Sequence, residues 1–419
     1  MKYLTTSHED LRGRTVLLRV DMNCPIKDGR IHGKRRIIEA AENLQYLKES
    51  RAVVITHQGR VGNDEYVELD GHADILSANC GRPVRYVRDV MGDAAIDAIR
   101  SMKNGDIILL DNLRFYAEEN YDYKSNADGA SSMVVRRLSP HLDACVLDAF
   151  PCAHRRHPSI TGFAYAGVDA YAGVITGREL TNLSRIMSIA KAPHVVVFGG
   201  SKIDDRLYAM DRLLNGGRAD HILLTGQVGC LFLYAQARLD ASMVSKEITS
   251  NHGLVKRAHI LMDKYPGKLH TPVDVAVNTG DGRRMDVDVR FARGFTIGDD
   301  AGPKNMQIHD IGPNTVEFYS KWISSAGTVF ISGPAGRFEH ECFAIGTRSI
   351  LQAAADSAAT TIISGGHLTT ALVNMGLTDK INHVSTAGGA LVLYMTGAVL
   401  PMVEALNWRQ KDEMCVMRT

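Results

Sequence analysis

The chain has 419 residues, enough for two or three domains, and its 45% hydrophobic and 23% charged content is ordinary for a globular protein. A formal net charge of +1 gives no general field for nucleic acid or an anionic membrane, so any anion site must be local. Seven scattered cysteines without a Cys-x-x-Cys pair favour reduced thiols, and because no signal segment or membrane-length apolar run is found, we expect a cytoplasmic protein.

Short runs rich in β-branched residues alternate with longer amphipathic stretches along the first half of the chain. The clearest helix is 34–50, where apolar residues recur with the spacing of one helix face. Such alternation is typical of a parallel sheet covered by helices on both faces. We predict strands at 15–23, 52–58, 107–115 and 144–150, and further helices at 93–102 and 131–138.

A single helical stretch, 177–192, interrupts this alternation and ends before Pro193. Strand–helix alternation then restarts, which predicts a hinge helix between two Rossmann-like α/β domains of similar size, each with a parallel sheet flanked by helices. One large sheet with a long helix is the alternative. We expect a first domain at 1–176, a second at 193–404, and a C-terminal segment, 405–419, packed back on the first. The predicted strands of the second domain are 194–200, 221–226, 269–277, 327–333, 360–366 and 382–388, with a surface hairpin at 281–290.

The strands of the first half all end in polar or basic residues. The carboxyl ends of parallel strands meet at one edge of a sheet, so these residues should converge on one basic pocket. Guanidinium groups donate paired hydrogen bonds to carboxylates and phosphates, which suits a small, doubly anionic ligand. A solvated basic turn is the alternative for the densest cluster, His154-Arg155-Arg156-His157. The predicted pocket residues are Asp21, Asn23, Arg36, His57, Arg60, Arg114, His154 and Arg155.

The strands of the second half end in glycine instead, and each is followed by a helical pattern. Glycine lets the backbone approach a phosphate closely, and a helix N-terminus offers free N–H groups and a positive dipole. Five such loops favour a polyphosphate ligand over turns that merely need glycine. The loops are Gly199-Gly200-Ser-Lys202, Gly226-Gln-Val-Gly229, Gly333-Pro334-Ala-Gly336, Gly365-Gly366-His367 and Ala387-Gly-Gly389.

The chain contains no Gly-x-x-x-x-Gly-Lys-[Ser/Thr], and its one Gly-x-Gly, at 280–282, does not open a helix. These absences disfavour P-loop and nicotinamide-binding proteins. A basic pocket on one domain and a glycine-lined phosphate site on the other predict phosphoryl transfer from a nucleotide to a small anion, with hinge closure that expels water.

Taken together, the motifs resemble those of phosphoglycerate kinases, in the same order and at similar spacing, from about residue 11 to about 407. The Gly-Gly-His turn is more similar to the archaeal branch than to the bacterial one. The motifs are Arg19-Val-Asp-Met-Asn-Cys-Pro, His57-Gln-Gly-Arg, Leu109-Leu-Asp-Asn-Leu-Arg-Phe, Asp148-Ala-Phe-Pro-Cys-Ala-His-Arg, Gly199-Gly-Ser-Lys, Asp310-Ile-Gly-Pro, Gly333-Pro-Ala-Gly-Arg-Phe-Glu and His383-Val-Ser-Thr-Ala-Gly-Gly-Ala.

This resemblance implies reversible transfer between ATP and 3-phosphoglycerate, giving ADP and 1,3-bisphosphoglycerate, with Mg²⁺ carried mainly by the nucleotide phosphates. The predicted pocket would hold 3-phosphoglycerate, and a monomer or a homodimer is expected. The implied catalytic residues are Arg36, Lys202 and Arg206. The implied nucleotide contacts are Gly199, Gly200, Lys202, Gly226, Gly333, Pro334, Glu339, Gly365, Gly366 and His367.

The sequence departs from the family pattern mainly in the nucleotide motifs. Arg206 stands where a second lysine is usual, and Ser332 replaces an asparagine. His367 replaces the aspartate that usually faces Mg²⁺, and imidazole is a poor ligand for this oxygen-seeking ion. Gln227 and Ala387 each replace a glycine. These changes leave nucleotide choice and metal geometry open.

Three alternatives therefore remain. A non-catalytic sensor that binds phosphoglycerate or a nucleotide would explain the altered loops. A nicotinamide-dependent oxidoreductase is disfavoured by the missing fingerprint. A zinc site at Cys152, His154 and His157 lacks a second ligand pair at zinc-like spacing.

Overall fold

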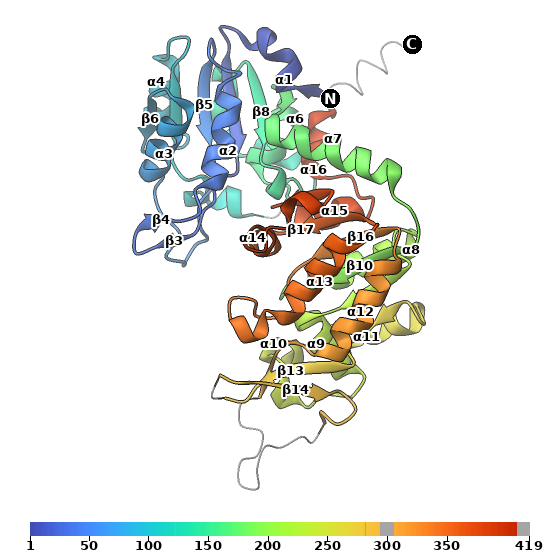
Figure 1. Ribbon diagram of the computed structural model, residues 1–419. Coiled ribbons are helices and arrows are strands. Elements are labelled where there is room, and N and C mark those ends of the chain that lie inside the picture. The colour runs from blue at the N-terminus through green and yellow to red at the C-terminus, as the bar shows by residue number, and fades with distance from the viewer. Residues whose placement is uncertain (122, 281, 294–305, 409–419) are drawn as a thin grey trace. The chain divides into compact units, whose positions relative to one another are not determined.

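The computed structural model describes residues 1–121, 123–280, 282–293 and 306–408 (Figure 1). The chain divides into two compact units, Met1–Thr181 with the segment from Val399 onward, and Asn182–Ala398. The division falls inside α7 (Val174–Ile189), the helix predicted at 177–192. Of the seven cysteines, six are described as free thiols, and Cys415 lies outside the described residues.

The first unit is built on a seven-stranded sheet in which every paired strand is parallel to its neighbour. The central strand is buried along its whole length, which explains why it is mainly apolar, with Arg19 as a buried exception. The outer strands are short and only partly buried, so no periodic signal predicted them. In spatial order the strands are β1 (Lys2–Tyr3), β9 (Asp169–Ala172), β8 (Ala144–Asp148), β2 (Thr15–Val20), β5 (Arg51–Ile55), β7 (Ile107–Leu110) and β6 (Val84–Val87).

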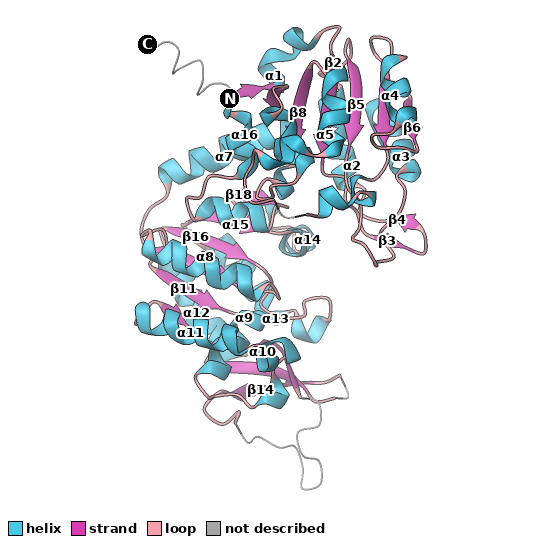
Figure 2. Ribbon diagram, turned by 180° about the vertical axis from the view of Figure 1, so that it is seen from behind, coloured by secondary structure: helices cyan, strands magenta, loops and turns pink. Residues whose placement is uncertain are grey.

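Helices lie on both faces of this sheet, as Figures 1 and 2 show from opposite sides. The apolar side chains of α2 (Arg35–Leu44) and α3 (Asp70–Cys80) share one core with β2, β5, β7 and β8. The helix α2 was predicted from its apolar stripe. The helix α3 was not, because its buried positions include His72 and Cys80 and show no clean stripe. The remaining helices of this unit include α4 (Asp93–Arg100), α5 (Met133–Leu138) and α16 (Pro401–Leu406).

His72 in α3 gives this unit a pH-dependent stability. The side chain is 1% exposed, its Nε2 lies 3.1 Å from Gln58 Oε1, and burial lowers its pKa from 6.5 to about 4. Between those two pH values the unfolded chain binds more protons than the folded chain, so stability is lost as the pH falls through this window. We expect this one residue to cost about 2 kcal/mol of unfolding free energy at pH 5.

Urea unfolding at pH 7 and pH 5 measures this effect. A His72→Asn variant, which cannot titrate in this range, should lose correspondingly less stability between the two pH values. If both proteins lose the same amount, the assigned role of His72 is wrong.

The second unit is built on a six-stranded parallel sheet. Its helices α12 (Pro313–Ser325), α13 (Ile345–Asp356) and α14 (Gly366–Asn374) share a core with one face of the sheet, and α8 (Ile203–Asn215) lies over the other (Figures 1 and 2). In order, its strands are β12 (Leu269–His270), β11 (His221–Leu224), β10 (His194–Phe198), β16 (Thr328–Ser332), β17 (Thr360–Ser364) and β18 (His383–Ser385). The remaining helices are α9 (Gly226–Ala235), α10 (Lys246–Ser250), α11 (His252–Lys264) and α15 (Gly389–Met395).

The predicted strand 269–277 is wrong as a single element. Its first residues form β12 of the parallel sheet, and its last belong to β13 (Asp274–Asn278) of a separate antiparallel sheet. Pro272 lies between them and has no N–H to continue a ladder. The predicted hairpin 281–290 is corrected too: β14 (Arg284–Asp288) pairs with β13, which also pairs with β15 (Gln307–Ile311), and residue 281 lies outside the described residues.

The helix α7 begins three residues before its predicted start because its first amides find acceptors far away in sequence. The Asp148 carboxylate accepts from Thr176 N at 2.7 Å and Ile175 N at 3.3 Å, and Asn43 Oδ1 accepts from Val174 N at 3.0 Å. These acceptors satisfy donors that every helix start leaves unpaired. Nothing in the local sequence of α7 announces such a cap.

The described end of the chain contacts the rest of the first unit. In α16, Met402 N donates to Ala153 O at 3.1 Å, and Glu404 Oε2 accepts from Asn126 Nδ2 at 2.6 Å. The rest of the predicted C-terminal segment, 409–419, lies outside the described residues. Among the helices that the structure describes, none combines the length and apolar character needed to cross a membrane.

Candidate active site

The segment after β2 places three of the predicted pocket residues together. Arg36 Nη1 donates to Asp21 Oδ2 and to Asn23 O, both at 3.1 Å. Asn23 Oδ1 in turn accepts from Gly59 N at 2.9 Å, which ties the β2 end to the β5 end. Asp21 is buried, whereas the Arg36 side chain is 29% exposed. The two acceptors therefore fix the guanidinium while part of it stays accessible to solvent or a ligand.

The ends of β5 and β7 add His57, Arg60 and Arg114. Both His57 and Arg114 are buried, and Arg114 Nη1 donates to Gly59 O. Burial and then the charges of nearby arginines, among them Arg155 and Arg60, lower the pKa of Arg114. A group of mutually repelling arginines needs an anion to balance it. The net charge of the whole chain is only +1, so an anion site has to be a local cluster of positive charge, and this group of arginines is such a cluster.

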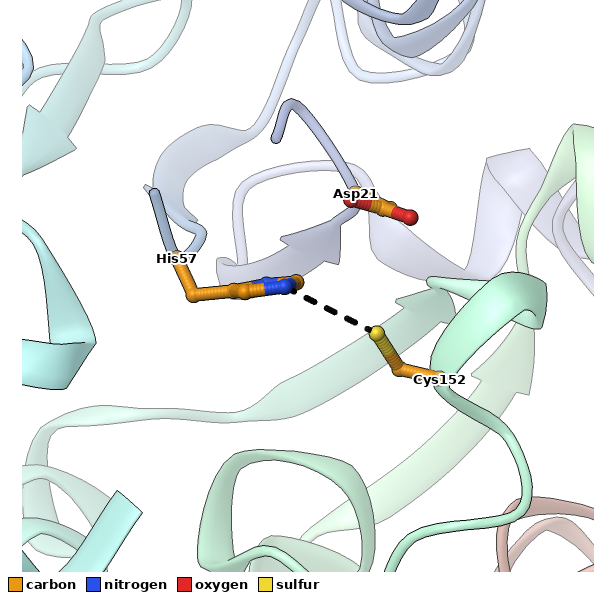
Figure 3. Close-up of side chains that lie close together, drawn as sticks. All are labelled: Asp21, His57 and Cys152. Atoms are coloured by element: carbon orange, nitrogen blue, oxygen red, sulfur yellow. Dashed lines mark hydrogen bonds between the residues drawn. The ribbon is translucent and has the colours of Figure 1, made fainter. Parts of the chain in front are cut away.

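The loop after β8 completes the pocket (Figure 3). Cys152 Sγ lies 3.9 Å from His57 Nε2, and a ligand atom of Asp21 lies within 4.8 Å of both. His154 and Arg155 follow in the same loop and are half-buried. The loop therefore brings residues from three strand ends to one place, as the parallel topology predicted.

The trio of Asp21, His57 and Cys152 has the residue types of a metal site but the wrong surroundings. Burial, followed by the charges of Arg19, Arg114 and Arg155, lowers the pKa of His57 well below its usual range. The same positive field opposes a divalent cation. Burial also raises the pKa of the Cys152 thiol, whereas a metal needs the thiolate.

The alternative of a zinc site at Cys152, His154 and His157 gains no support either. His157 Nδ1 lies 3.5 Å from the buried carboxylate of Glu119, so this imidazole already has a partner of its own.

In the second unit, the glycine loops at the ends of β10, β11 and β16 pack backbone against backbone. A Cβ on Gly333, whose φ is +89°, would lie 2.2 Å from the carbonyl oxygen of Gly199. Close packing therefore accounts for these glycines without a ligand. The amides of Gly199, Gly200 and Gly226 donate to the carbonyls of Ser332, Pro334 and Ala335 at 3.0, 2.9 and 3.1 Å.

The loops at the ends of β17 and β18 differ from these three. Within the described part of the chain, a Cβ on Gly365, Gly366 or Gly388 would meet no atom within 4 Å. The N-terminus of α14 begins at Gly366 and leaves its first amides without helical acceptors. This loop is therefore the better candidate for direct amide–phosphate contact.

The two cations after β10 have different environments. Lys202 is exposed at the start of α8. Arg206 is 6% exposed, and its guanidinium carbon lies 5.1 Å from the centre of the Phe198 ring. Burial lowers the pKa of Arg206 to about 10, so it stays charged at neutral pH. Its buried Nε finds no hydrogen-bond partner among the described residues.

Glu339 and His367 are both exposed, and a ring contact at 5.7 Å between Phe338 and His367 joins their loops. The turn 364–367 itself contains no acidic residue, so it offers no carboxylate of its own.

The comparisons with known proteins decide the family. The model of the phosphoglycerate kinase family matches residues 6–398. The chain is 39% identical to the phosphoglycerate kinase of Methanothermus fervidus, over 98% of each chain, and 39% identical to that of Methanothermobacter thermautotrophicus, over 97% of each. The chain belongs to the phosphoglycerate kinase family.

Its fold agrees with that of a solved phosphoglycerate kinase. The crystal structure from Pyrococcus horikoshii OT3 matches with a TM-score of 0.84 and 34% identity, covering 97% of this chain and 98% of that chain. The predicted α/β fold, the family and the kinase activity with a carboxyl acceptor are thus confirmed. The oxidoreductase alternative is wrong.

Two buried residues behind the arginine cluster are not among the predicted site residues. Arg19 is 1% exposed inside β2, and Glu119 is 2% exposed in the turn that follows Tyr116. A signal for Arg19 existed, because an arginine within a fully buried strand requires a partner. Glu119 has no such signal, since it lies in a polar loop.

Proposed function

We propose that the first unit binds 3-phosphoglycerate and that the second binds ATP or ADP with Mg²⁺, with α7 as the hinge. The observation that carries this proposal is the cluster of buried and half-buried arginines around His57 and Asp21. Guanidinium pairs suit the carboxylate and phosphate at the two ends of this substrate. The residues assigned to it are Asp21, Asn23, Arg36, His57, Arg60, Arg114, His154 and Arg155.

In the proposed reaction, the carboxylate of 3-phosphoglycerate attacks the γ-phosphorus of ATP in line, and ADP leaves. No covalent enzyme intermediate is needed, because a loose phosphoryl transition state asks mainly for position and charge neutralisation. We assign Arg36 to the stabilisation of the transferring group. We assign Lys202 and Arg206 to the nucleotide side, Lys202 by direct contact and Arg206 by a fixed charge beneath the loop.

We propose that closure about α7 excludes water while transfer takes place.

The nucleotide would be held by Lys202, by the strand-end loops and by Glu339 at the ribose. The loop residues assigned to it are Gly199, Gly200, Gly226, Gly333, Pro334, Gly365, Gly366 and His367.

The residues near the nucleotide loops fit a metal carried by the nucleotide rather than a protein cage. His367 offers imidazole where Mg²⁺ prefers oxygen, and Asp204 is already paired with Arg257 at 2.5 Å. Bound with the nucleotide, Mg²⁺ would neutralise phosphate charge. We propose that phosphate oxygens and water supply most of its ligands.

A Lys202→Ala variant tests the division of labour between the units. We expect nucleotide affinity to fall by roughly tenfold or more, since one charge-assisted contact is lost, while 3-phosphoglycerate affinity stays unchanged. Calorimetric titration with each ligand measures both. Lys321→Ala, an exposed lysine of the same unit paired with Glu317 at 2.7 Å, is the matched control. Equal loss of both ligands would contradict the assignment.

A further inference from the structure

Arg19 is a fully buried arginine whose three nitrogens all have partners. Its Nε donates to Ser159 Oγ at 2.8 Å, its Nη1 donates to Val20 O, and its Nη2 lies 3.1 Å from His57 Nδ1. The side chain comes from the middle of the sheet and reaches the back of the imidazole. The three contacts fix the guanidinium in one orientation, and at 1% exposure it is not accessible to a ligand.

A buried carboxylate balances the charge of Arg19. Glu119 Oε1 lies 3.7 Å from Arg19 Nη2 and accepts from Ser159 Oγ at 2.5 Å. Burial would raise the pKa of Glu119, but the hydrogen bond from His157 and the charge of Arg19 outweigh it, and the net shift is downward. Glu119 is therefore ionised, and Arg19 remains a charged donor inside the protein.

The contact with His57 decides which of its nitrogens carries the proton. A guanidinium group has donors and no acceptor, so Nδ1 of His57 must accept and cannot carry a hydrogen. Burial and the surrounding arginines keep His57 neutral, which leaves one ring proton. That proton must then lie on Nε2, the nitrogen 3.9 Å from Cys152 Sγ in the cluster that also contains Asp21.

We propose that Arg19 is a positioning residue that locks His57 as the neutral Nε2–H tautomer, so that His57 presents an N–H donor to the substrate. The substrate-facing half of this proposal rests on the proposed binding of 3-phosphoglycerate in this pocket. In the opposite tautomer, an Nε2 lone pair would face the anionic oxygens and repel them. Arg19 thus acts on the substrate through the imidazole and not by contact.

The first test is the protonation pattern of His57 in the intact protein. Long-range ¹H–¹⁵N spectra of ¹⁵N-histidine-labelled protein, with His57→Gln used to assign the signals, distinguish the two tautomers. We expect a protonated Nε2 and a bare Nδ1 at neutral pH. A proton on Nδ1, or a doubly protonated ring, would overturn the proposal whatever any variant does.

The second test removes the donor. Arg19→Met combined with Glu119→Gln avoids a buried unpaired carboxylate, and Glu119→Gln alone is the matched control because it keeps the Arg19–His57 contact. We expect the double variant to show mixed His57 tautomers and a KM for 3-phosphoglycerate raised roughly tenfold or more, with the KM for ATP unchanged. The native tautomer and KM in this variant would refute the role of Arg19.

A third measurement separates this proposal from the proposed function. Adding 3-phosphoglycerate should shift the His57 Nε2–H signal. If the signal does not move while the tautomer is as expected, the substrate-facing half and the assignment of the pocket both fail, and control of the tautomer by Arg19 is still supported. In a His57→Gln background, the Arg19→Met/Glu119→Gln changes should have no further effect on KM beyond that of Glu119→Gln. If KM rises in that background as much as it does with His57 present, Arg19 does not act through the His57 imidazole.

Discussion

An Arg36→Ala variant should fold normally and lose roughly 10²–10³-fold or more in turnover, as removal of one preorganised transition-state donor does elsewhere. The side chain is partly exposed at the first turn of α2, so truncation opens no core cavity. Its contacts to Asp21 Oδ2 and Asn23 O fix the guanidinium at the end of β2. In the proposed role of Arg36, the lost interaction strengthens as charge develops on the transferring group, so kcat should fall more than KM rises.

Steady-state kinetics with 3-phosphoglycerate and ATP measure both constants, and circular dichroism reports the fold. The neighbouring Arg35 offers a matched control, because it is paired with Glu39 on the outer face of the same helix. Arg35→Ala should keep nearly full turnover. Undiminished kcat in Arg36→Ala would remove Arg36 from the catalytic machinery.

An Asp148→Ala variant should lose about 3 kcal/mol of unfolding free energy, through a structural effect rather than a chemical one. The carboxylate is buried at the end of β8 and accepts from Asn43 Nδ2 at 2.6 Å as well as from the first amides of α7. Alanine would leave these buried donors without an acceptor. The start of α7, the proposed hinge, should open first.

Urea unfolding measures the loss, and hydrogen exchange of the Ile175 and Thr176 amides locates it. Asp74→Ala is the matched control, since Asp74 is exposed on α3 and its truncation should change stability by less than about 0.5 kcal/mol. Unaltered protection of those two amides in Asp148→Ala would show that the cap does not hold the helix.

The elements that the sequence predicted are those whose burial is uniform or strictly periodic. The central strands β2, β5, β7 and β8 are almost wholly buried and mainly apolar, and α2 has one regular apolar stripe. The short outer strands and α3 were missed because mixed burial gives them no period. The apolar segment 269–277 does form β-structure, but its first residues belong to the parallel sheet and its last to the antiparallel sheet.

The glycine loops show the same limit in the proposed nucleotide site. The glycines can be read from the local sequence, but the reason why glycine is needed differs from loop to loop. Gly333 and Gly199 are required by mutual backbone contact, whereas Gly366 faces open space in the described structure. A motif by itself cannot distinguish packing from ligand binding, because glycine serves both.

The sequence alone determined the α/β class and which side chains lie at the strand ends, because burial pattern is local and parallel strands bring their carboxyl ends to one edge. Only the tertiary structure decided the partners. Arg19 meets Ser159 across 140 positions, and Asp148 caps α7 from 28 positions away. Such contacts depend on how whole strands and loops pack. They fix the start of α7, the proposed hinge, and they carry the proposed control of the His57 proton.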